Sequence, residues 1–302
     1  MLASTNPTLT ALGFAPQDRV VIFHADDLGM CHATLPAFKD LLTAGLLSSA
    51  SVMMPCNWSA EAVDVARARA GSDVGVHLTL TSEWDTCRWR PLTTPQDARL
   101  VDHAGFFHRT VEEARQTDPA SVAAELRAQL ETALAAGLNV THLDAHMGTA
   151  ADPRYVPDVV NLSRQYGIPA MIPRFTAAQW QAVGLNPLQA GEAERLVQHL
   201  EAQGFPLVDH LRMLPLDLAG DHTALTLHLL RDLPPGITHF ILHPAIDTPE
   251  LRAIAPDWEA RVANYRAFID PTLLKGVRDL GVQVIGYRPL RDLLRQRLGM
   301  KP

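Results

Sequence analysis

Short apolar runs alternate with longer amphipathic stretches along most of this chain. The apolar runs are rich in β-branched and aromatic residues, which predicts buried strands, whereas apolar residues at three- or four-residue spacing predict helices. The predicted strands are residues 19–25, 49–54, 74–80, 140–144, 169–172, 238–243 and 282–287. The predicted helices between them are residues 35–44, 61–70, 121–136, 156–166, 193–202, 224–231 and 271–280.

This alternation predicts an α/β fold with a parallel sheet and right-handed crossovers. Because seven strands are predicted rather than eight, the pattern indicates a TIM-like (β/α) barrel that is incomplete. We expect a single barrel domain over residues 18–302 and an N-terminal leader, residues 1–17, outside the core. Residues 81–118 show little periodicity and are expected to form an inserted loop region over one end of the sheet.

Composition argues against several classes of protein. A net charge of −7 over 302 residues disfavours a nucleic-acid-binding surface, which needs clustered basic residues. Because the first residues lack a basic start followed by an apolar stretch, no signal peptide is expected, and no apolar run approaches the ~20 residues that span a bilayer. Three widely spaced cysteines fit free thiols in a reducing compartment, which predicts a cytoplasmic location. A homodimer is expected only because most soluble oligomers are dimers of this kind.

Polar residues gather where the predicted strands end. Asp26 and Asp27 follow the first strand, His77 lies on the third, and His146 and His243 close the fourth and the sixth. In parallel α/β folds the C-terminal ends of the strands share one face, and active sites are found there. We therefore expect these side chains to meet.

The residue types suit a hydrolytic metal site. One carboxylate and two imidazoles leave a position open for water, whose pKa a metal lowers while it polarises the carbonyl under attack. A second carboxylate can act as general base, and a further histidine can protonate the departing atom. Taken singly, an Asp-Asp pair is more often a turn or a helix cap, and a histidine is more often a hydrogen-bonded core residue. Their joint placement at strand ends favours the metal site.

Two further residues have open interpretations. Trp84, in the inserted loop region, could stack on a sugar ring or pack the loop onto the barrel, and packing is slightly favoured because aromatic residues bury well. Asp144 could contact a substrate, orient a histidine, or bond to local backbone.

The chain resembles the YdjC/ChbG-type carbohydrate deacetylases, also called the ChbG/HpnK family, over about residues 19 to 290. The family's Asn-Ala-Asp-Asp-Phe-Gly is matched by His24-Ala25-Asp26-Asp27-Leu28-Gly29, and its Gly-x-His-x-x-Leu-Thr by Gly75, His77, Leu80 and Thr81. Its Thr-His-Leu-Asp-Ser-His corresponds to Thr141-His142-Leu143-Asp144-Ala145-His146, and its Cys-His-Pro-Ala to Leu242-His243-Pro244-Ala245.

The resemblance implies a (β/α)-barrel hydrolase that removes the N-acetyl group from an amino-sugar-containing saccharide or glycolipid. It also implies that Asp27, His77 and His146 hold one divalent metal ion, Zn²⁺ or Mg²⁺. Asp26 would then be the general base and His243 the general acid.

Substrate contacts are expected from Arg174, which lies near a family arginine, and from Asp144 and Trp84. Two positions depart from the family pattern. Met147-Gly148 follow His146 where many members have a histidine-rich stretch, and His24 replaces an asparagine. Two alternatives stay open, a metal-dependent hydrolase of another amide or an ester and a catalytically silent sugar-binding protein.

Overall fold

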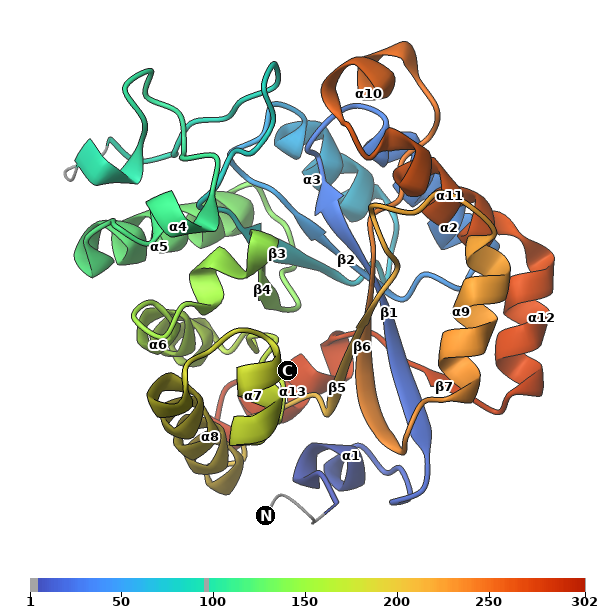
Figure 1. The fold of residues 1–302 in the computed structure, drawn as a ribbon. Coiled ribbons are helices and arrows are strands. Elements are labelled where there is room, and N and C mark those ends of the chain that lie inside the picture. Colours follow the sequence, from blue (N-terminus) through green and yellow to red (C-terminus); the bar gives the residue numbers. More distant parts are fainter. Residues whose placement is uncertain (1–4, 95–97, 302) are drawn as a thin grey trace.

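The computed structural model describes residues 5–94 and 98–301. Its strands all run parallel, in the order β4-β3-β2-β1-β6-β5, and the sheet curls so that helices lie around its outside (Figure 1). The first half of β1 pairs with β7, and its second half pairs with β2. The strands are β1 (Arg19–Leu28), β2 (Ser49–Val52), β3 (Val74–Leu78), β4 (Leu143–Ala145), β5 (His210–Met213), β6 (Gly236–Leu242) and β7 (Gln283–Val284).

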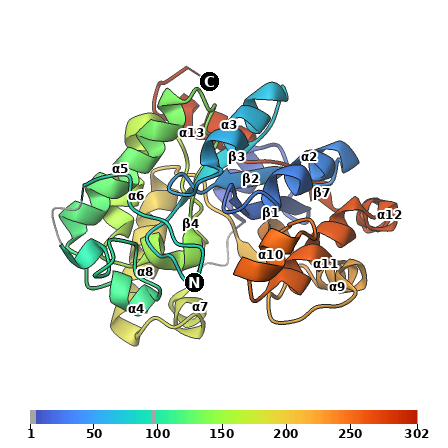
Figure 2. The same ribbon diagram turned by 90° about the horizontal axis from the view of Figure 1, so that it is seen from above.

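Seen from above, the helices surround the strands (Figure 2). They are α1 (Pro7–Ala11), α2 (Thr34–Ala44), α3 (Ser59–Ala68), α4 (Val111–Ala114), α5 (Pro119–Ala135), α6 (Val156–Tyr166), α7 (Ala177–Ala182), α8 (Pro187–Ala202), α9 (His222–Arg231), α10 (Pro249–Ile254), α11 (Trp258–Ile269), α12 (Pro271–Asp279) and α13 (Arg288–Arg297), with 3₁₀ helices η1 (Ala98–Leu100) and η2 (His146–Ala151). Each predicted helix overlaps one of these, while α1, α4, α7, α10, α11 and α13 were not predicted. Within the described residues, no helix is long and apolar enough to cross a membrane.

The barrel-like α/β fold and the number of strands confirm the sequence prediction, but one predicted strand is wrong. Within residues 169–172 the structure has a single parallel bridge, between Ala170 and Leu143, instead of a strand, with Met171 N–H donating to Leu143 O at 2.7 Å. The chain then bridges from Pro173 to Val208, directly before β5. The strand β5 was missed because its sequence lacks an apolar run and its side chains stay partly exposed, Met213 by 53%.

Helix α1 is part of the core because it packs against one side of β1. Alternate residues of β1 pack on opposite sides, so that Val20 and Ile22 join a cluster that also contains Leu9 of α1. Leu9 is only 1% exposed, and Asn6 Nδ2 donates to Leu207 O at 2.9 Å. The expectation that the leader lies outside the core is therefore wrong for α1, because its apolar side covers one end of the sheet's interior.

The opposite side of β1 packs against helix α11. Phe23 packs edge-on against Phe240 of β6 and Phe268 of α11, with ring centroids 5.4 Å and 5.2 Å away. Such aromatic pairs bury large apolar areas and fix the geometry of the elements that carry them. The contact holds α11 beside the C-terminal half of β1.

Candidate metal centre

A bulge at the end of β1 turns two consecutive carboxylates toward the same histidine. The pairing with β2 shifts register between Ala25 and Leu28, and Asp27 has a left-handed backbone with φ of 62°. Consecutive side chains of a regular strand point to opposite faces, so this break allows both Asp26 and Asp27 to approach His77. Their carboxylate oxygens lie 3.8 Å and 3.4 Å, respectively, from His77 Nε2.

Asp27, His77 and His146 form a compact and buried group, which we call the mouth group. Asp27 Oδ1 lies 3.4 Å from His77 Nε2 and 3.2 Å from His146 Nδ1. One donor atom from each residue lies within 4.8 Å of the others, a separation that one metal ion could bridge. The residues come from β1, β3 and the start of η2, so the fold brings together the three side chains expected to hold a metal.

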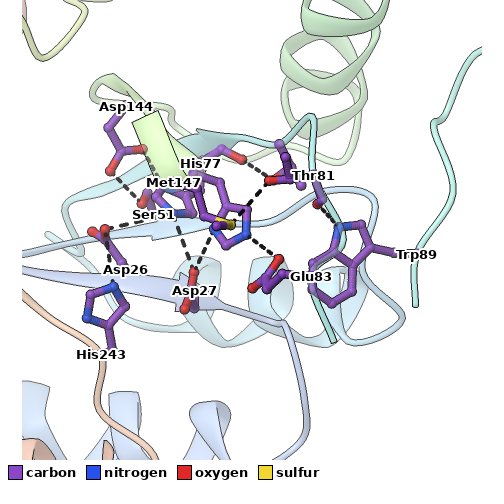
Figure 3. A network of polar contacts seen from close by, with 12 residues as sticks. Asp26, Asp27, Ser51, His77, Thr81, Glu83, Trp89, Asp144, Met147 and His243 are labelled. Carbon is purple, nitrogen blue, oxygen red and sulfur yellow. Dashed lines mark hydrogen bonds and ion pairs between the residues drawn. The ribbon is translucent and has the colours of Figure 1, made fainter. Parts of the chain in front are cut away.

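A second carboxylate faces the far nitrogen of each imidazole. Figure 3 shows His77, Asp144 and Glu83: His77 Nδ1 lies 3.1 Å from Asp144 Oδ1. His146 Nε2 lies 3.1 Å from Glu83 Oε2. A carboxylate at this place fixes the tautomer and the orientation of the ring, which leaves the near nitrogen available to a metal. Glu83 makes its contact as a hydrogen bond, whereas Asp144 lies at ion-pair distance from His77, which favours the interpretation that Asp144 orients a histidine.

Arg261 of α11 holds the other side of Asp27. Its Nη1 donates to Asp27 Oδ2 at 2.7 Å and its Nε donates to Asp257 Oδ1 at 2.8 Å, while its guanidinium lies over the ring of Trp84. Burial would raise the pKa of Asp27, but Arg261 and the two histidines outweigh it and hold that pKa well below its usual value.

The remaining oxygen of Asp27 is the clearest sign that a cation fits here. Asp27 Oδ1 is buried and has no hydrogen-bond partner within the described part of the chain, although it faces two imidazole nitrogens. A buried carboxylate oxygen in this position is favourable only when positive charge lies next to it, supplied by the protonated rings or by a metal ion. The mouth group thus offers one ionised oxygen and two oriented nitrogens, a donor set typical of zinc and of related divalent ions.

The same carboxylates control the protonation of the two histidines. Burial lowers the pKa of both rings, but Asp144 and Asp26 raise that of His77 well above its usual value. Glu83 and Asp27 raise the pKa of His146 to about 9. Without a cation both rings are therefore protonated at neutral pH, and a metal must displace those protons in order to bind.

Asp26 and His243 lie next to each other beside the mouth group. Asp26 Oδ2 is 3.7 Å from His243 Nε2, and the two side chains are 11% and 10% exposed, so solvent reaches both. Asn264 of α11 accepts the backbone N–H of His243 at 2.8 Å and fixes this strand end. Burial lowers the pKa of His243, which keeps this imidazole neutral at pH 7.

His24 lies between Asp26, the candidate general base, and Asp144, the carboxylate that faces His77. Its Nε2 lies 2.9 Å from Asp144 Oδ2, 3.2 Å from Asp26 Oδ1 and 3.0 Å from Ser51 Oγ. The ring is fully buried, which lowers its pKa, yet Asp144 and Asp26 raise that pKa to about 9. A cationic His24 therefore reduces the repulsion between these two carboxylates.

The expected substrate residues are not all in this region. The Arg174 guanidinium pairs with Glu201 of α8 and lies 3.8 Å from Asp209, so it is not brought to the mouth group. Trp84 is 5% exposed, and its ring packs against Trp89 with centroids 6.0 Å apart. This burial agrees with the packing interpretation of Trp84.

Three residues that contact the site were missed from the sequence. Glu83 lies in a segment without periodicity, and Arg261 and Asn264 lie on a helix that was not predicted. An Arg261 and an Asn264 three residues apart share one helical face, which is the signal that could have identified them once α11 was recognised.

The chain is similar in sequence to a known protein family and to curated relatives. The family model described as YdjC-like protein matches residues 20–279. A carbohydrate deacetylase of Thermus thermophilus is 33% identical over 91% of this chain and 95% of its own length. A carbohydrate deacetylase of Vibrio vulnificus is 27% identical over 89% of this chain and 96% of its own.

A solved structure shows the same fold. It belongs to a protein of Enterococcus faecalis V583 that was provisionally assigned to cellobiose-phosphate cleavage, and it aligns with a TM-score of 0.73. The match covers 90% of this chain and 99% of that one at 18% identity. From the family model and the full-length relatives, we conclude that the chain belongs to the YdjC-like protein family.

Proposed function

We propose that this protein is a metal-dependent carbohydrate N-deacetylase, which removes the acetyl group from an N-acetylated amino sugar in a saccharide or glycolipid. The observation that carries the proposal is the convergence of the mouth group with Asp26 and His243, since these residues supply metal ligands, a base and an acid side by side. The full-length relatives named carbohydrate deacetylases support this choice of reaction.

Asp27, His77 and His146 would hold the divalent ion, through Asp27 Oδ1, His77 Nε2 and His146 Nδ1. Two imidazoles suit Zn²⁺, and a carboxylate also accepts Mg²⁺. When bound, such an ion lowers the pKa of water and polarises the acetyl carbonyl. Asp144 and Glu83 keep both rings in the orientation that this requires.

Asp26 would accept the proton that water loses as it attacks the acetyl carbonyl. Its carboxylate is ionised because His77 and His24 lower its pKa against the effect of burial. His243 is neutral and 3.7 Å from Asp26, so it can take up this proton and pass it to the sugar nitrogen as the C–N bond breaks. The products are acetate and the free amine.

The decisive experiment measures acetate release from N-acetylglucosamine, diacetylchitobiose and an N-acetylglucosaminyl lipid. Metal-stripped and metal-restored protein are compared, together with Asp26→Asn and a matched control, Asp64→Asn, whose side chain is 76% exposed on α3. We expect metal-dependent release that Asp26→Asn lowers by at least about a hundredfold, the contribution of a general base. The control should retain full activity.

Two results would count against the proposal. Release that survives metal removal would exclude the metal site as the centre of the reaction. Metal binding without acetate release from any sugar would favour another amide or ester as substrate, or a sugar-binding protein without turnover.

A further inference from the structure

Two non-glycine residues in the described ranges of the chain have a left-handed backbone, and both lie at the metal centre. One is Asp27, a member of the mouth group, with φ of 62°. The other is Met147, with φ of 51°, which directly follows His146 of the same group. A residue with a Cβ is strained in this conformation, whereas glycine adopts it freely. Strained residues of this kind gather at functional sites.

The side chain of Met147 is also exposed. It is 49% accessible, whereas the neighbouring His146 is 4% accessible. In Figure 3 the sulfur of Met147 points to Thr81, whose hydroxyl lies 3.5 Å away in the segment that links β3 to Glu83. An exposed methionine alone needs no explanation, but here exposure is combined with a strained backbone. Packing in the core therefore does not account for methionine at this position.

The position of Met147 limits the part of a substrate that it can contact. His146 Nδ1 faces Asp27 Oδ1 at 3.2 Å, so an acyl carbonyl that reacts at the mouth group comes close to the chain neighbour of Met147. The methyl of an acetyl group is bonded directly to that carbonyl carbon, which makes it the nearest apolar part of an N-acetylated sugar. The flexible and polarizable thioether of methionine suits contact with a small apolar group.

We propose that Met147 contacts the methyl of the acetyl group and favours N-acetyl over N-formyl substrates. This inference rests on the proposed function, because it names the acyl group that the same site prefers. Burial of one methyl against the side chain should improve kcat/KM about fourfold. The competing explanation is that residue 147 only turns the chain so that His146 reaches Asp27.

The first test compares two acyl groups on one sugar, glucosamine or chitobiose, whichever the acetate assay selects. The ratio of kcat/KM for the N-acetyl form to that for the N-formyl form is measured in the wild type, Met147→Gly and Met147→Leu. Glycine removes the side chain and relieves the strain, so the competing explanation predicts no change in the ratio. We expect Met147→Gly to lower the ratio about fourfold, mainly through the KM of the acetyl form, and Met147→Leu to preserve it. An unchanged ratio in Met147→Gly would overturn the inference.

The second test measures binding and needs no turnover. Acetate and formate are titrated by calorimetry into the metal-restored wild type and Met147→Gly. Acetate should bind about fourfold more weakly to the variant, and formate, which lacks the methyl, should bind equally to both. This result together with no acetate release from any sugar would overturn the proposed function and support the methyl contact. Acetate that binds equally to both proteins, or to neither, would overturn the inference.

Two further variants exclude an indirect effect. Met147→Gln nearly keeps the length of the side chain and keeps its Cβ but makes it polar, and should lower the acetyl-to-formyl ratio as Met147→Gly does. Met300→Gly makes the same change at a methionine that is 39% exposed after α13, and should leave the ratio unchanged. Metal content is measured in every variant. If Met147→Gly loses its metal because His146 is loosened, Met147→Gln decides, and a wild-type ratio in that variant would overturn the inference.

Discussion

Two sets of histidines lie inside the same sheet, yet their protonation is opposite. In the mouth group, His77 faces three carboxylates and His146 faces two, and these raise the pKa of both rings despite burial. Below them His142 and His239, with Tyr287, form what we call the floor group, in which the ring of Tyr287 stacks on His142 at 4.0 Å and its hydroxyl contacts His239 Nδ1 at 2.8 Å. Burial there lowers the pKa of His142, and lowers that of His239 to about 3.

The difference shows that burial does not by itself make a histidine a ligand. Both groups are fully buried, so desolvation favours the neutral ring in each. Only in the mouth group do carboxylates offset this effect and hold a positive charge that a metal can replace. The nearby cation His24 lowers the pKa of His142 and His239 further, which keeps both rings neutral.

The largest expected effect comes from removing a ligand of the mouth group. His146→Ala should lower metal affinity by more than about a hundredfold, because loss of a ligand exceeds the effect of losing its outer partner. His239→Gln, in the floor group, should retain one metal per chain. Metal content after dialysis, measured by atomic emission, checks both, and an equal loss in the two variants would contradict the distinction between the groups.

A smaller loss is expected when only the partner of a ligand changes. Asp144→Asn keeps the size of the side chain but removes the charge behind His77, and should lower metal affinity or activity about 10- to 100-fold. Glu83→Gln should have the weaker effect of the two, because the Glu83 side chain is 20% exposed whereas that of Asp144 is 3% exposed. Competition with a chromophoric chelator measures both affinities, and a stronger effect of Glu83→Gln would refute this ranking.

The smallest effect is on the stability of the metal-free protein, where the two groups have opposite signs. The pKa of His146 is raised from 6.5 to about 9, so its contribution is complete below pH 6.5 and is lost as the pH rises through 9. The pKa of His239 is lowered to about 3, so its contribution is complete above pH 6.5 and is lost as the pH falls toward 3. Because one pKa unit corresponds to ~1.4 kcal/mol, each change should be at most about 3 to 5 kcal/mol in the free energy of unfolding.

Urea unfolding in the presence of a chelator, from about pH 4 to pH 9, tests this prediction. His146→Gln should flatten the alkaline side of the stability profile and His239→Gln the acidic side. If either variant altered the opposite side, the assignment of that slope would be wrong.

The sequence was most informative where chemistry and chain position coincide. Asp27, His77 and His146 lie at or just after the ends of the strands β1, β3 and β4, and parallel strands bring their C-terminal ends together regardless of the intervening chain. Arg261 and Glu83 could not be found in this way. Their side chains reach Asp27 and His146 from a helix and a loop, and such contacts depend on tertiary packing instead of local pattern.

The same limit explains the errors in the fold. Residues 169–172 are apolar but pair through one isolated bridge, whereas β5 pairs along its length with β6 although His210 and Arg212 give it no apolar signal. A neighbouring strand provides the hydrogen bonds in the second case. The β-propensity of one segment does not reveal the hydrogen bonds that a neighbouring strand supplies to it.

The position of α1 has a consequence for how the chain matures during synthesis. Leu9 packs in a cluster with Ile237, Tyr287 and Leu290. These packing partners of the first helix are translated more than two hundred residues after it. Contacts between such distant parts of a chain form slowly, because a long loop must close first. On the ribosome the first helix therefore remains without its final neighbours until almost the whole chain has emerged, and is a segment on which a chaperone can act.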